Sequence, residues 1–489
     1  MIKELQLLPY YKIKELLVNK KLSAIELIDH YIEDALKKNQ QYNAYCEFTN
    51  NLSRKQAELS QKRIDNNVAL QIESIPISVK DNYCTKGILT TACSKILKNF
   101  IPTYESTVTN NLFINGAIII GKTNMDEFAM GSSNTNSFFG NVINPFKGSD
   151  SNKDLVAGGS SGGSAVSVAA KMCLASLGTD TGGSVRLPAS FTGTVGVKPT
   201  YGRCSRYGII SFASSLDQAG VLASNLTDAA MVLESICCFD KKDPTSKNIN
   251  KPNIVSNIGK SIKKMKIGIP KEYQRNEIHS QTIKYWQLAE KWLTDAGAEI
   301  ISISLPHTDY ALPTYYIIAN AEASSNLARY DGIRYGTRIE NRGDNFQDII
   351  TRTRGECFGN EVKRRIVSGN YVLSTSHFGE YYKKAQRVRR LILNDFTEAF
   401  SKVDCILTPT TPKYAFEIGG KYDPIDVYNN DLFTIPASLA GLPCVSIPVG
   451  FSSNNLPLGL QLIAKHFDEE SLFQIGKVIE ENSDFNINK

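Results

Sequence analysis

Short apolar runs alternate with helical patterns along most of this chain of 489 residues, and this alternation limits its fold more than any other feature. Short apolar runs are typical of buried strands, whereas apolar residues repeated every three or four positions indicate helices. The strand-like runs fall at 75–79, 117–120, 194–197, 266–269, 300–305, 405–407, 445–449 and 458–463. The helical patterns fall at about 105–115, 164–177, 227–238, 280–296, 380–400 and 470–480. The alternation predicts an α/β fold in which helices cover a sheet.

We expect one domain of residues 1–489, because strand patterns lie on both sides of the clearest linker-like stretch. That stretch, about residues 240–264, is rich in Lys, Asn and Ser and predicts a surface excursion. The pattern over about residues 1–65 predicts an N-terminal helical segment. In this segment, Ser23 and Glu26 have the spacing of a capping box. The apolar residues that follow at helical spacing are Ile25, Ile28, Ile32 and Leu36.

The composition is that of an ordinary globular chain, and it argues against several classes of function. A formal charge of +6 is small for this length and does not predict a nucleic-acid-binding protein. Ten cysteines without a Cys-x-x-Cys spacing fit reduced thiols better than a disulfide framework or a zinc site. No apolar run approaches the ~20 residues of a membrane span, and the N-terminus lacks the apolar core of a signal peptide. We therefore expect a cytoplasmic protein with no membrane contact and no bound metal.

Two loops rich in glycine and serine, together with one lysine, carry the chemistry. The first loop is Gly158-Gly159-Ser160-Ser161-Gly162-Gly163-Ser164, and the second is Gly178-Thr179-Asp180-Thr181-Gly182-Gly183-Ser184. Lys80 ends the apolar run at 75–79, where burial disfavours its charged form unless it is paired. Two serines on glycine loops and a buried lysine suggest a nucleophile, a relay and a base that cleave an amide.

Each of these groups has a chemical reason to take part. Ser184 would attack, but a hydroxyl is a weak nucleophile near pH 7 and needs a base. Lys80 is that base if burial lowers its pKa far enough for a neutral amine, and Ser160 would pass the proton inward. Backbone N–H groups would form an oxyanion hole at Thr181, Gly182, Gly183 and Ser184. Two alternatives stay open: a histidine brought near by folding, or flexible surface loops with Lys80 paired to Asp81.

Two patterns resemble phosphate-binding loops. Residues 116–123 fit G-x-x-x-x-G-K-[ST], but the central Ala-Ile-Ile-Ile reads as a strand whose amides pair within a sheet. The loop 158–164 precedes a helix but contains no lysine or arginine. Neither pattern predicts nucleotide binding. Arg186, just past the second loop, is expected to tie that loop down through carbonyls or carboxylates.

The two loops and the lysine closely resemble the amidase signature family. The match includes 158–164, the second loop with Val185 and Arg186, and Lys80 in its Pro-Ile-Ser-Val-Lys-Asp context. The two loop serines stand 24 positions apart (184 − 160), as in the family. The resemblance implies the family's fold, a large mixed β-sheet sandwiched between layers of α-helices, with a signature core at about 70–220. It also implies a Ser–cisSer–Lys triad of Ser184, Ser160 and Lys80. Leu187 stands where many members have glutamine.

Within the family, the chain resembles the glutaminase subunits of tRNA-dependent amidotransferases over nearly its whole length. The segments that carry this resemblance are 198–203, 205–208, 212–218, 324–327, 329–336, 358–365 and 431–434. It implies that glutamine is hydrolysed through an ester of Ser184 and is contacted by Tyr315, Arg364 and Asp431. An arginine suits the α-carboxylate of glutamine, and an aspartate suits its α-ammonium group.

The same resemblance implies partners. Such subunits join B and C subunits in a heterotrimer and deliver ammonia to a partner, which uses ATP and Mg²⁺ to activate misacylated tRNA. No cofactor is then expected on this chain, and tRNA would be bound mainly through the partner. A basic run at 383–390 is either a solvated helix face or a tRNA or subunit contact. A stand-alone amidase for another small amide and a catalytically silent scaffold subunit stay open.

Overall fold

A mixed β-sheet of 11 strands spans the part of the chain that the computed structural model describes, residues 2–149 and 153–485. The order of its strands is β1-β3-β2-β4-β6-β5-β10-β11-β9-β7-β8. β2 is parallel to β3 and β4, and β7 is parallel to β8 and β9, while the other neighbours are antiparallel. The strands are β1 Tyr45–Phe48, β2 Pro76–Lys80, β3 Ile118–Thr123, β4 Ala175–Asp180, β5 Val195–Lys198, β6 Gln218–Ala223, β7 Lys266–Pro270, β8 Glu299–Ile303, β9 Cys405–Pro409, β10 Cys444–Phe451 and β11 Pro457–Ala464.

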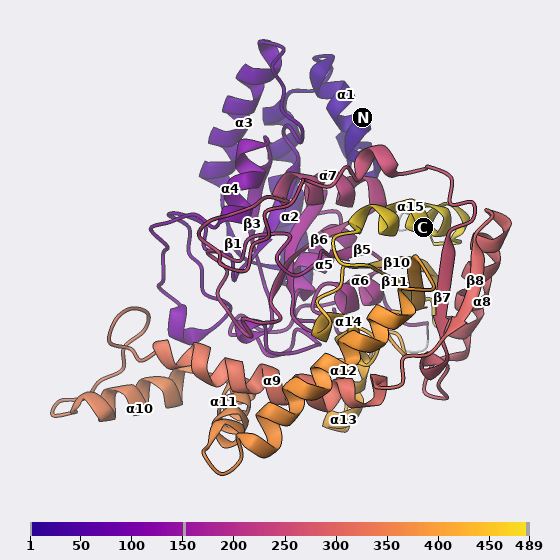
Figure 1. Cartoon of the computed structure of the whole chain (residues 1–489). Coiled ribbons are helices and arrows are strands. Elements are labelled where there is room, and N and C mark those ends of the chain that lie inside the picture. Colours follow the sequence, from indigo (N-terminus) through magenta and orange to yellow (C-terminus); the bar gives the residue numbers. More distant parts are fainter. Residues whose placement is uncertain (1, 150–152, 486–489) are drawn as a thin grey trace.

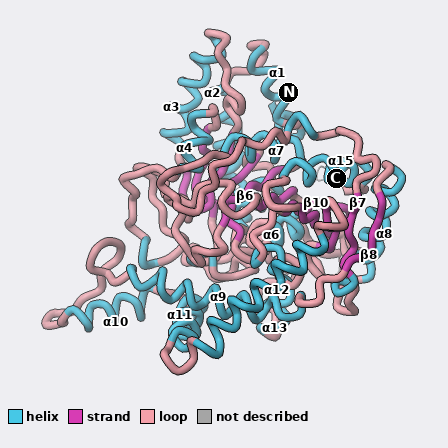
Figure 2. The backbone as a smooth tube through the Cα atoms, viewed as in Figure 1, coloured by secondary structure: helices cyan, strands magenta, loops and turns pink. Residues whose placement is uncertain are grey.

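Helices cover this sheet on both sides (Figures 1 and 2). They are α1 Tyr10–Val18, α2 Ala24–Tyr42, α3 Asn50–Asp65, α4 Thr107–Ile114, α5 Gly162–Ala169, α6 Arg186–Thr192, α7 Leu226–Ile236, α8 Ser280–Asp295, α9 Ala311–Asn326, α10 Phe346–Cys357, α11 Asn360–Leu373, α12 Lys384–Ala399, α13 Pro424–Tyr428, α14 Ile435–Leu439 and α15 Glu469–Asn482. In Figure 1, α7 and α15 lie above the sheet, α9, α11 and α12 lie below it, and α10 extends away from the body. The predicted α/β class, with a large mixed sheet between helices, is confirmed.

All eight predicted strand runs correspond to strands, namely β2, β3, β5 and β7–β11. The helix predicted over 164–177 is wrong in its second half, because α5 ends at Ala169 and β4 begins at Ala175. Lys171 has a φ of +58°, a left-handed conformation that ends the helix. The segment Ala175–Asp180 that follows pairs with β2 on one edge and β6 on the other. Pairing on both edges outweighs the helix propensity of its alanine and leucine residues.

The predicted capping box lies at the start of α2. Ser23 Oγ accepts a hydrogen bond from the N–H of Glu26 at 3.1 Å, and the carboxylate of Glu26 accepts one from the N–H of Ser23 at 2.9 Å. Of the predicted apolar residues, Ile28 and Ile32 are buried, whereas Ile25 and Leu36 are 39% and 41% exposed. The buried stripe therefore runs slightly around the helix from the predicted one, through Ala24, Leu27, Ile28, Tyr31, Ile32 and Ala35.

Two further expectations concern loops. The phosphate-loop pattern at 116–123 lies largely in β3, which pairs with β1 and β2 as the sequence predicted. Lys122 of this pattern is buried and donates to the carbonyl of Tyr83 at 2.6 Å. Residues 240–264 contain one short 3-10 turn, Val255–Asn257, and the sheet continues on both sides of them.

Among the described residues, no helix is both long and apolar enough to cross a membrane.

Candidate active site

Lys80 ends β2 and reaches the first glycine loop. Its Nζ atom lies 2.8 Å from Oγ of Ser160 and 2.8 Å from Oγ of Ser161, and it donates to Oγ1 of Thr179 at 2.9 Å. Successive side chains of a strand point to opposite faces, so the next residue, Asp81, points away from this contact. Asp81 faces Lys122 instead, with Nζ 3.6 Å from Oδ1. The alternative in which Lys80 pairs with Asp81 is therefore wrong.

The environment of Lys80 favours a neutral amine. Burial lowers the pKa of Lys80 to about 7, although the carboxylates of Asp126, Asp180 and Asp217 favour its charged form. The side chain is fully buried. An amine with a pKa near 7 is unprotonated in about half of the molecules at neutral pH, and its lone pair then accepts a proton. Lys80 thus has the electrostatics of a general base.

Ser160 is held on a loop that requires glycine beside it. The peptide bond between Gly159 and Ser160 is cis. The N–H of Gly159 donates to the carbonyl of Ser132 at 2.8 Å, and the carbonyl of Ser160 accepts from the N–H of Asp126 at 3.2 Å. A side chain at position 159 would begin only 2.0 Å from Oδ2 of Asp126. The loop therefore packs tightly and is not a flexible surface turn.

Ser184 stands on the second loop, between β4 and α6, and is 7% exposed. Its carbonyl accepts from the N–H of Ser161 at 3.1 Å, which joins the two glycine loops. Within the described part of the chain, the N–H groups of Gly182, Gly183 and Ser184 donate no hydrogen bond, and none joins the hydroxyls of Ser160 and Ser184. Free amides beside a serine hydroxyl are the donors that a developing oxyanion requires.

A buried ion pair fixes the second loop. Arg186 donates through Nε and Nη2 to the two oxygens of Asp180, each at 2.9 Å. The same guanidinium donates to the carbonyl of Thr434 at 2.9 Å and to Oε1 of Gln461 at 2.6 Å. Burial opposes the charge on Arg186, but Asp180, Cys444 and Asp431 together outweigh it and hold the pKa of Arg186 above its ordinary value. The prediction that Arg186 ties the loop down is confirmed.

Two of the three residues assigned to glutamine lie against this loop. A side chain at Gly182 would begin 2.7 Å from Cζ of Tyr315, and one at Gly183 would begin 2.8 Å from Oδ1 of Asp431. Both side chains are buried. The carboxyl group of Asp431 accepts no hydrogen bond from any described residue, and burial together with Asp180 raises its pKa to about 8. An ammonium group would supply the missing partner.

The third residue, Arg364, has a different environment. Its side chain is 62% exposed and pairs with Glu361 at 2.5 Å. The neighbouring Arg365 is buried, donates to Glu361 at 2.8 Å and lies over the ring of Tyr316, 5.3 Å from its centroid. The positive charge of Arg365 also favours the ionised form of Asp431. Arg365 was not predicted as a site residue, although it shares a helix face with the buried residues Val362, Ile366 and Gly369.

A cavity of about 460 Å³ opens beside the first loop. Its walls include Glu361, Arg364 and Arg365 of α11, together with residues 131–133. The carbonyl of Ser132 in that wall is the one that accepts from Gly159. A cavity of this size holds a small amide such as an amino-acid side chain and its α-groups.

Two buried aspartates near Lys80 were also missed. Asp126 accepts from the N–H of Asn134 at 2.9 Å, and Asp217 accepts from the hydroxyl of Thr181 at 2.8 Å. Burial raises the pKa of Asp126 and of Asp217 to about 6 in each case. Their sequence contexts, Asn-Met-Asp-Glu-Phe and Ser-Leu-Asp-Gln-Ala, mix polar and apolar residues and give no pattern that predicts burial.

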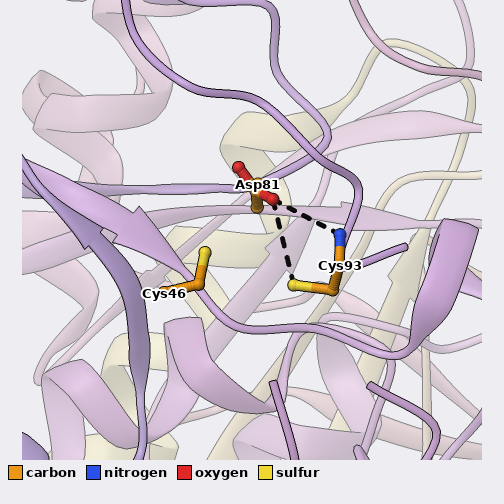
Figure 3. Close-up of side chains that lie close together, drawn as sticks. All are labelled: Cys46, Asp81 and Cys93. Atoms are coloured by element: carbon orange, nitrogen blue, oxygen red, sulfur yellow. Dashed lines mark hydrogen bonds between the residues drawn. The ribbon is translucent and has the colours of Figure 1, made fainter. Parts of the chain in front are cut away.

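Cys46, Asp81 and Cys93 gather beyond the end of β2 (Figure 3). One oxygen of Asp81 accepts from the N–H of Thr91 at 2.9 Å and from that of Cys93 at 3.3 Å. The other oxygen faces Lys122. Because Lys122 already balances the charge of this carboxylate, the cluster is explained as part of the core. All ten cysteines, which lie within the described residues, are free thiols.

Arg389, in the basic run at 383–390, also has a structural role. It donates to the carbonyl of Leu439 at 2.8 Å and to Oγ of Ser215 at 2.8 Å. Arg387 and Arg390 are exposed. One arginine of the run thus holds α12 to α14, and the others remain on the surface.

Comparisons with known proteins identify the family of the chain. Residues 26–473 match the family model described as Amidase. The chain is 53% identical over 466 residues to the A subunit of glutamyl-tRNA(Gln) amidotransferase from Orientia tsutsugamushi (strain Ikeda), across 95% of this chain and 94% of that relative. It is 52% identical to the A subunit from Ehrlichia canis (strain Jake), across 99% of each chain. The crystal structure of the A subunit from Thermotoga maritima is 39% identical, with a TM-score of 0.78 across 95% of this chain and 92% of that one. The chain therefore belongs to the amidase family.

Proposed function

We propose that this chain is the glutamine-hydrolysing subunit of a tRNA-dependent amidotransferase. It supplies ammonia for converting Glu-tRNA(Gln) to Gln-tRNA(Gln), and Asp-tRNA(Asn) to Asn-tRNA(Asn) where that substrate is served. The observation that carries the proposal is the 2.8 Å contact between Nζ of Lys80 and Oγ of Ser160, beside the loop of Ser184. The choice of glutamine is supported by relatives named as the A subunit of glutamyl-tRNA(Gln) amidotransferase.

In the first half of the reaction, Oγ of Ser184 attacks the side-chain amide carbon of glutamine. The proton of Ser184 passes to Ser160, and the proton of Ser160 passes to neutral Lys80. The carbonyl oxygen becomes an oxyanion that accepts from the N–H groups of residues 181–184, and each such donor is worth about 3 kcal/mol in comparable enzymes. The carbon–nitrogen bond then breaks. Lys80 returns its proton through Ser160 to the leaving nitrogen, which departs as ammonia.

In the second half, water replaces ammonia. A water molecule attacks the glutamyl ester of Ser184, its proton moves through Ser160 to Lys80, and the same amides hold the second oxyanion. Collapse returns the proton to Ser184 and releases glutamate. Asp431 would hold the α-ammonium group, Arg364 the α-carboxylate and Tyr315 the side-chain stem. The carboxyl group of Asp431, which accepts no hydrogen bond from the described residues, supports this assignment.

The partners follow from the same proposal. B and C subunits complete a heterotrimer, and the ammonia passes to a partner that binds ATP and Mg²⁺ and holds most of the misacylated tRNA. This chain itself then needs no cofactor. Because its product serves aminoacyl-tRNA synthesis, we place the protein in the cytoplasm.

A glutaminase assay on the full chain, alone and with B and C subunits, ATP and misacylated tRNA, tests the proposal. Without misacylated tRNA we expect equal amounts of ammonia and glutamate. In the complete mixture we expect faster glutamate release, with part of the ammonia transferred to the tRNA, and in Ser184→Ala we expect loss of both products. The exposed Ser256→Ala serves as the matched control. Full glutaminase activity in Ser184→Ala contradicts the mechanism. Hydrolysis of unrelated amides without any response to the partners would identify a stand-alone amidase.

A further inference from the structure

Glu127 lies between the catalytic loops and the start of α11. It begins a short 3-10 turn, Glu127–Ala129, directly after Asp126, whose N–H donates to the carbonyl of Ser160 at 3.2 Å. Oε2 of Glu127 accepts from the N–H of Gly359 at 2.8 Å, and its other oxygen accepts from the hydroxyl of Ser94. The side chain is 5% exposed. One short segment therefore contacts the proposed relay serine on one side and α11 on the other.

Gly359 precedes α11, and its lack of a side chain leaves room for the carboxylate of Glu127. A side chain at Gly359 would begin 2.3 Å from Oε2 of Glu127. The helix has no side-chain cap of its own at this residue. A carboxylate at the start of a helix satisfies a free N–H group and interacts favourably with the positive end of the helix dipole. Glu127 thus acts as the N-terminal cap of α11 from another segment of the chain.

Phe128 strengthens the same junction. Its ring lies 4.8 Å from that of Tyr330 and 5.8 Å from that of Phe358, the residue before Gly359. Phe128 and Ala129 have φ values of +51° and +62°, so the turn bends sharply after Glu127. Glu127 and Phe128 are consequently both presented to the junction between α10 and α11.

The first two turns of α11 carry the residues that face the cavity. Glu361 holds Arg364 at 2.5 Å and Arg365 at 2.8 Å, and all three line the cavity. The two guanidinium groups therefore move with the start of the helix. A displacement of about 1 Å in a substrate-positioning group is enough to change turnover strongly.

We propose that ionised Glu127 is a positioning residue that fixes the start of α11, and with it Arg364, which receives the α-carboxylate of the substrate. The inference rests on the proposed glutaminase function and deepens it. It adds a residue that touches neither the substrate nor the reacting atoms, and it makes substrate binding depend on pH.

The pH dependence follows from the surroundings of Glu127. Burial raises the pKa of Glu127 to about 7, although the Ser94 hydroxyl, the Gly359 N–H and the charge of Lys363 favour the carboxylate. The other charged or titratable groups at this junction are Asp126, Lys95, Lys98, Glu356 and Cys357. The folded-state pKa exceeds the ordinary value of 4.5, so the unfolded chain binds fewer protons between these two pH values. Ionisation of Glu127 therefore costs stability as pH rises through this window.

The test is Glu127→Gln in the full chain, assayed with its partner subunits. We expect KM for glutamine to rise about tenfold at pH 8 while kcat changes less than about twofold, since uniform substrate binding is what weakens. The free energy of unfolding at pH 8 should stay the same or increase. Glu105→Gln is the matched control, because Glu105 also accepts from a backbone N–H and a hydroxyl and its pKa is also raised by burial.

Two further measurements separate positioning from simple structural support. Ser94→Ala should move the midpoint of the KM profile to higher pH, because the hydroxyl of Ser94 stabilises the carboxylate. The substrate 4-aminobutanamide keeps the amide and the ammonium group of glutamine but lacks the α-carboxylate. Its kcat/KM should be nearly the same for the native chain and Glu127→Gln.

Hydrogen exchange at the first turn of α11 is measured in parallel and should be faster in Glu127→Gln. Unchanged exchange there, or an equal loss of turnover for glutamine and 4-aminobutanamide, would overturn the inference. A loss of unfolding free energy with an unchanged KM would overturn it as well. Absence of glutamine hydrolysis in the native chain counts against the proposed function instead, and the exchange at α11 then decides whether Glu127 fixes the helix.

Discussion

The Nζ atom of Lys80 lies 2.8 Å from Oγ of Ser160, and both groups are fully buried. The contact leaves the amine no partner of opposite charge at hydrogen-bond distance among the described residues, since its other partners are Ser161 and Thr179. Lysine in such an environment loses its proton more readily than in water. The same burial that makes the charged form costly therefore makes the amine a usable base at neutral pH.

The first prediction is a pH dependence of turnover. Only neutral Lys80 accepts a proton, and its pKa is about 7, so kcat/KM for glutamine should increase with pH through about 7. Lys80→Met should lower kcat by about 10²- to 10⁴-fold, the usual contribution of general-base catalysis. Initial rates between pH 5.5 and 9 measure both effects. A profile of the native chain that stays flat from pH 6 to 8 would contradict a lysine base.

The second prediction concerns stability. Arg186→Met leaves the buried carboxylate of Asp180 without its partner, and breaking one side of such a pair costs about 3–5 kcal/mol of unfolding free energy. Urea unfolding followed by circular dichroism measures the loss. Arg54→Met is the control, because Arg54 pairs with Asp29 on the surface and its removal should leave the unfolding midpoint unchanged. Equal midpoints for Arg186→Met and the native chain would show that the pair does not support the loop.

Sequence patterns predicted those strands and loops whose structure depends on residues close together in the sequence. Strand runs such as 75–79 are short and apolar, which is enough to predict a buried strand. The glycines around Ser160 and Ser184 indicate backbone that packs closely against other segments. β4 was not predicted because its sequence, Ala-Ser-Leu-Gly-Thr-Asp, lacks the apolar run of the other buried strands, and only pairing with β2 and β6 makes it a strand. β1 is four residues long and gives too short a pattern.

Some residues of the candidate site could be predicted from sequence motifs, and others become apparent only in the folded structure. Lys80, Ser160 and Ser184 could be found because each belongs to a motif. The partners of Lys80 that tune its pKa, Asp126 and Asp217, come from distant segments and become visible only when burial is known. Arg364 and Arg365 are neighbours in sequence, and the packing of α11 decides which of them is buried beside Tyr316.

The third prediction separates these two arginines. Arg364→Ala should raise KM for glutamine about tenfold, the effect expected when a charged contact to the α-carboxylate is lost, with an unchanged unfolding midpoint because its side chain is 62% exposed. Arg365→Ala should lower the unfolding midpoint as well, since Arg365 is buried against Tyr316 and Phe212. Steady-state kinetics and urea unfolding of both variants provide the measurement. A rise in KM confined to Arg365→Ala would assign the carboxylate to Arg365.

The last prediction is a proton release on substrate binding. Asp431 has a pKa of about 8 while its carboxyl group lacks a partner, so much of it is protonated at pH 7.5. The α-ammonium group of glutamine favours the carboxylate, and binding should therefore release a proton and weaken as pH falls below about 8. Calorimetry of glutamine binding to Ser184→Ala, in buffers of different ionisation enthalpy, measures the release without turnover. Adding Asp431→Asn should remove the share of the release that Asp431 supplies and leave only the smaller share from Glu127, whereas adding Asp228→Asn, at another buried aspartate with a raised pKa, should leave the release unchanged. Equal proton release with and without Asp431→Asn would contradict an ammonium contact at this residue.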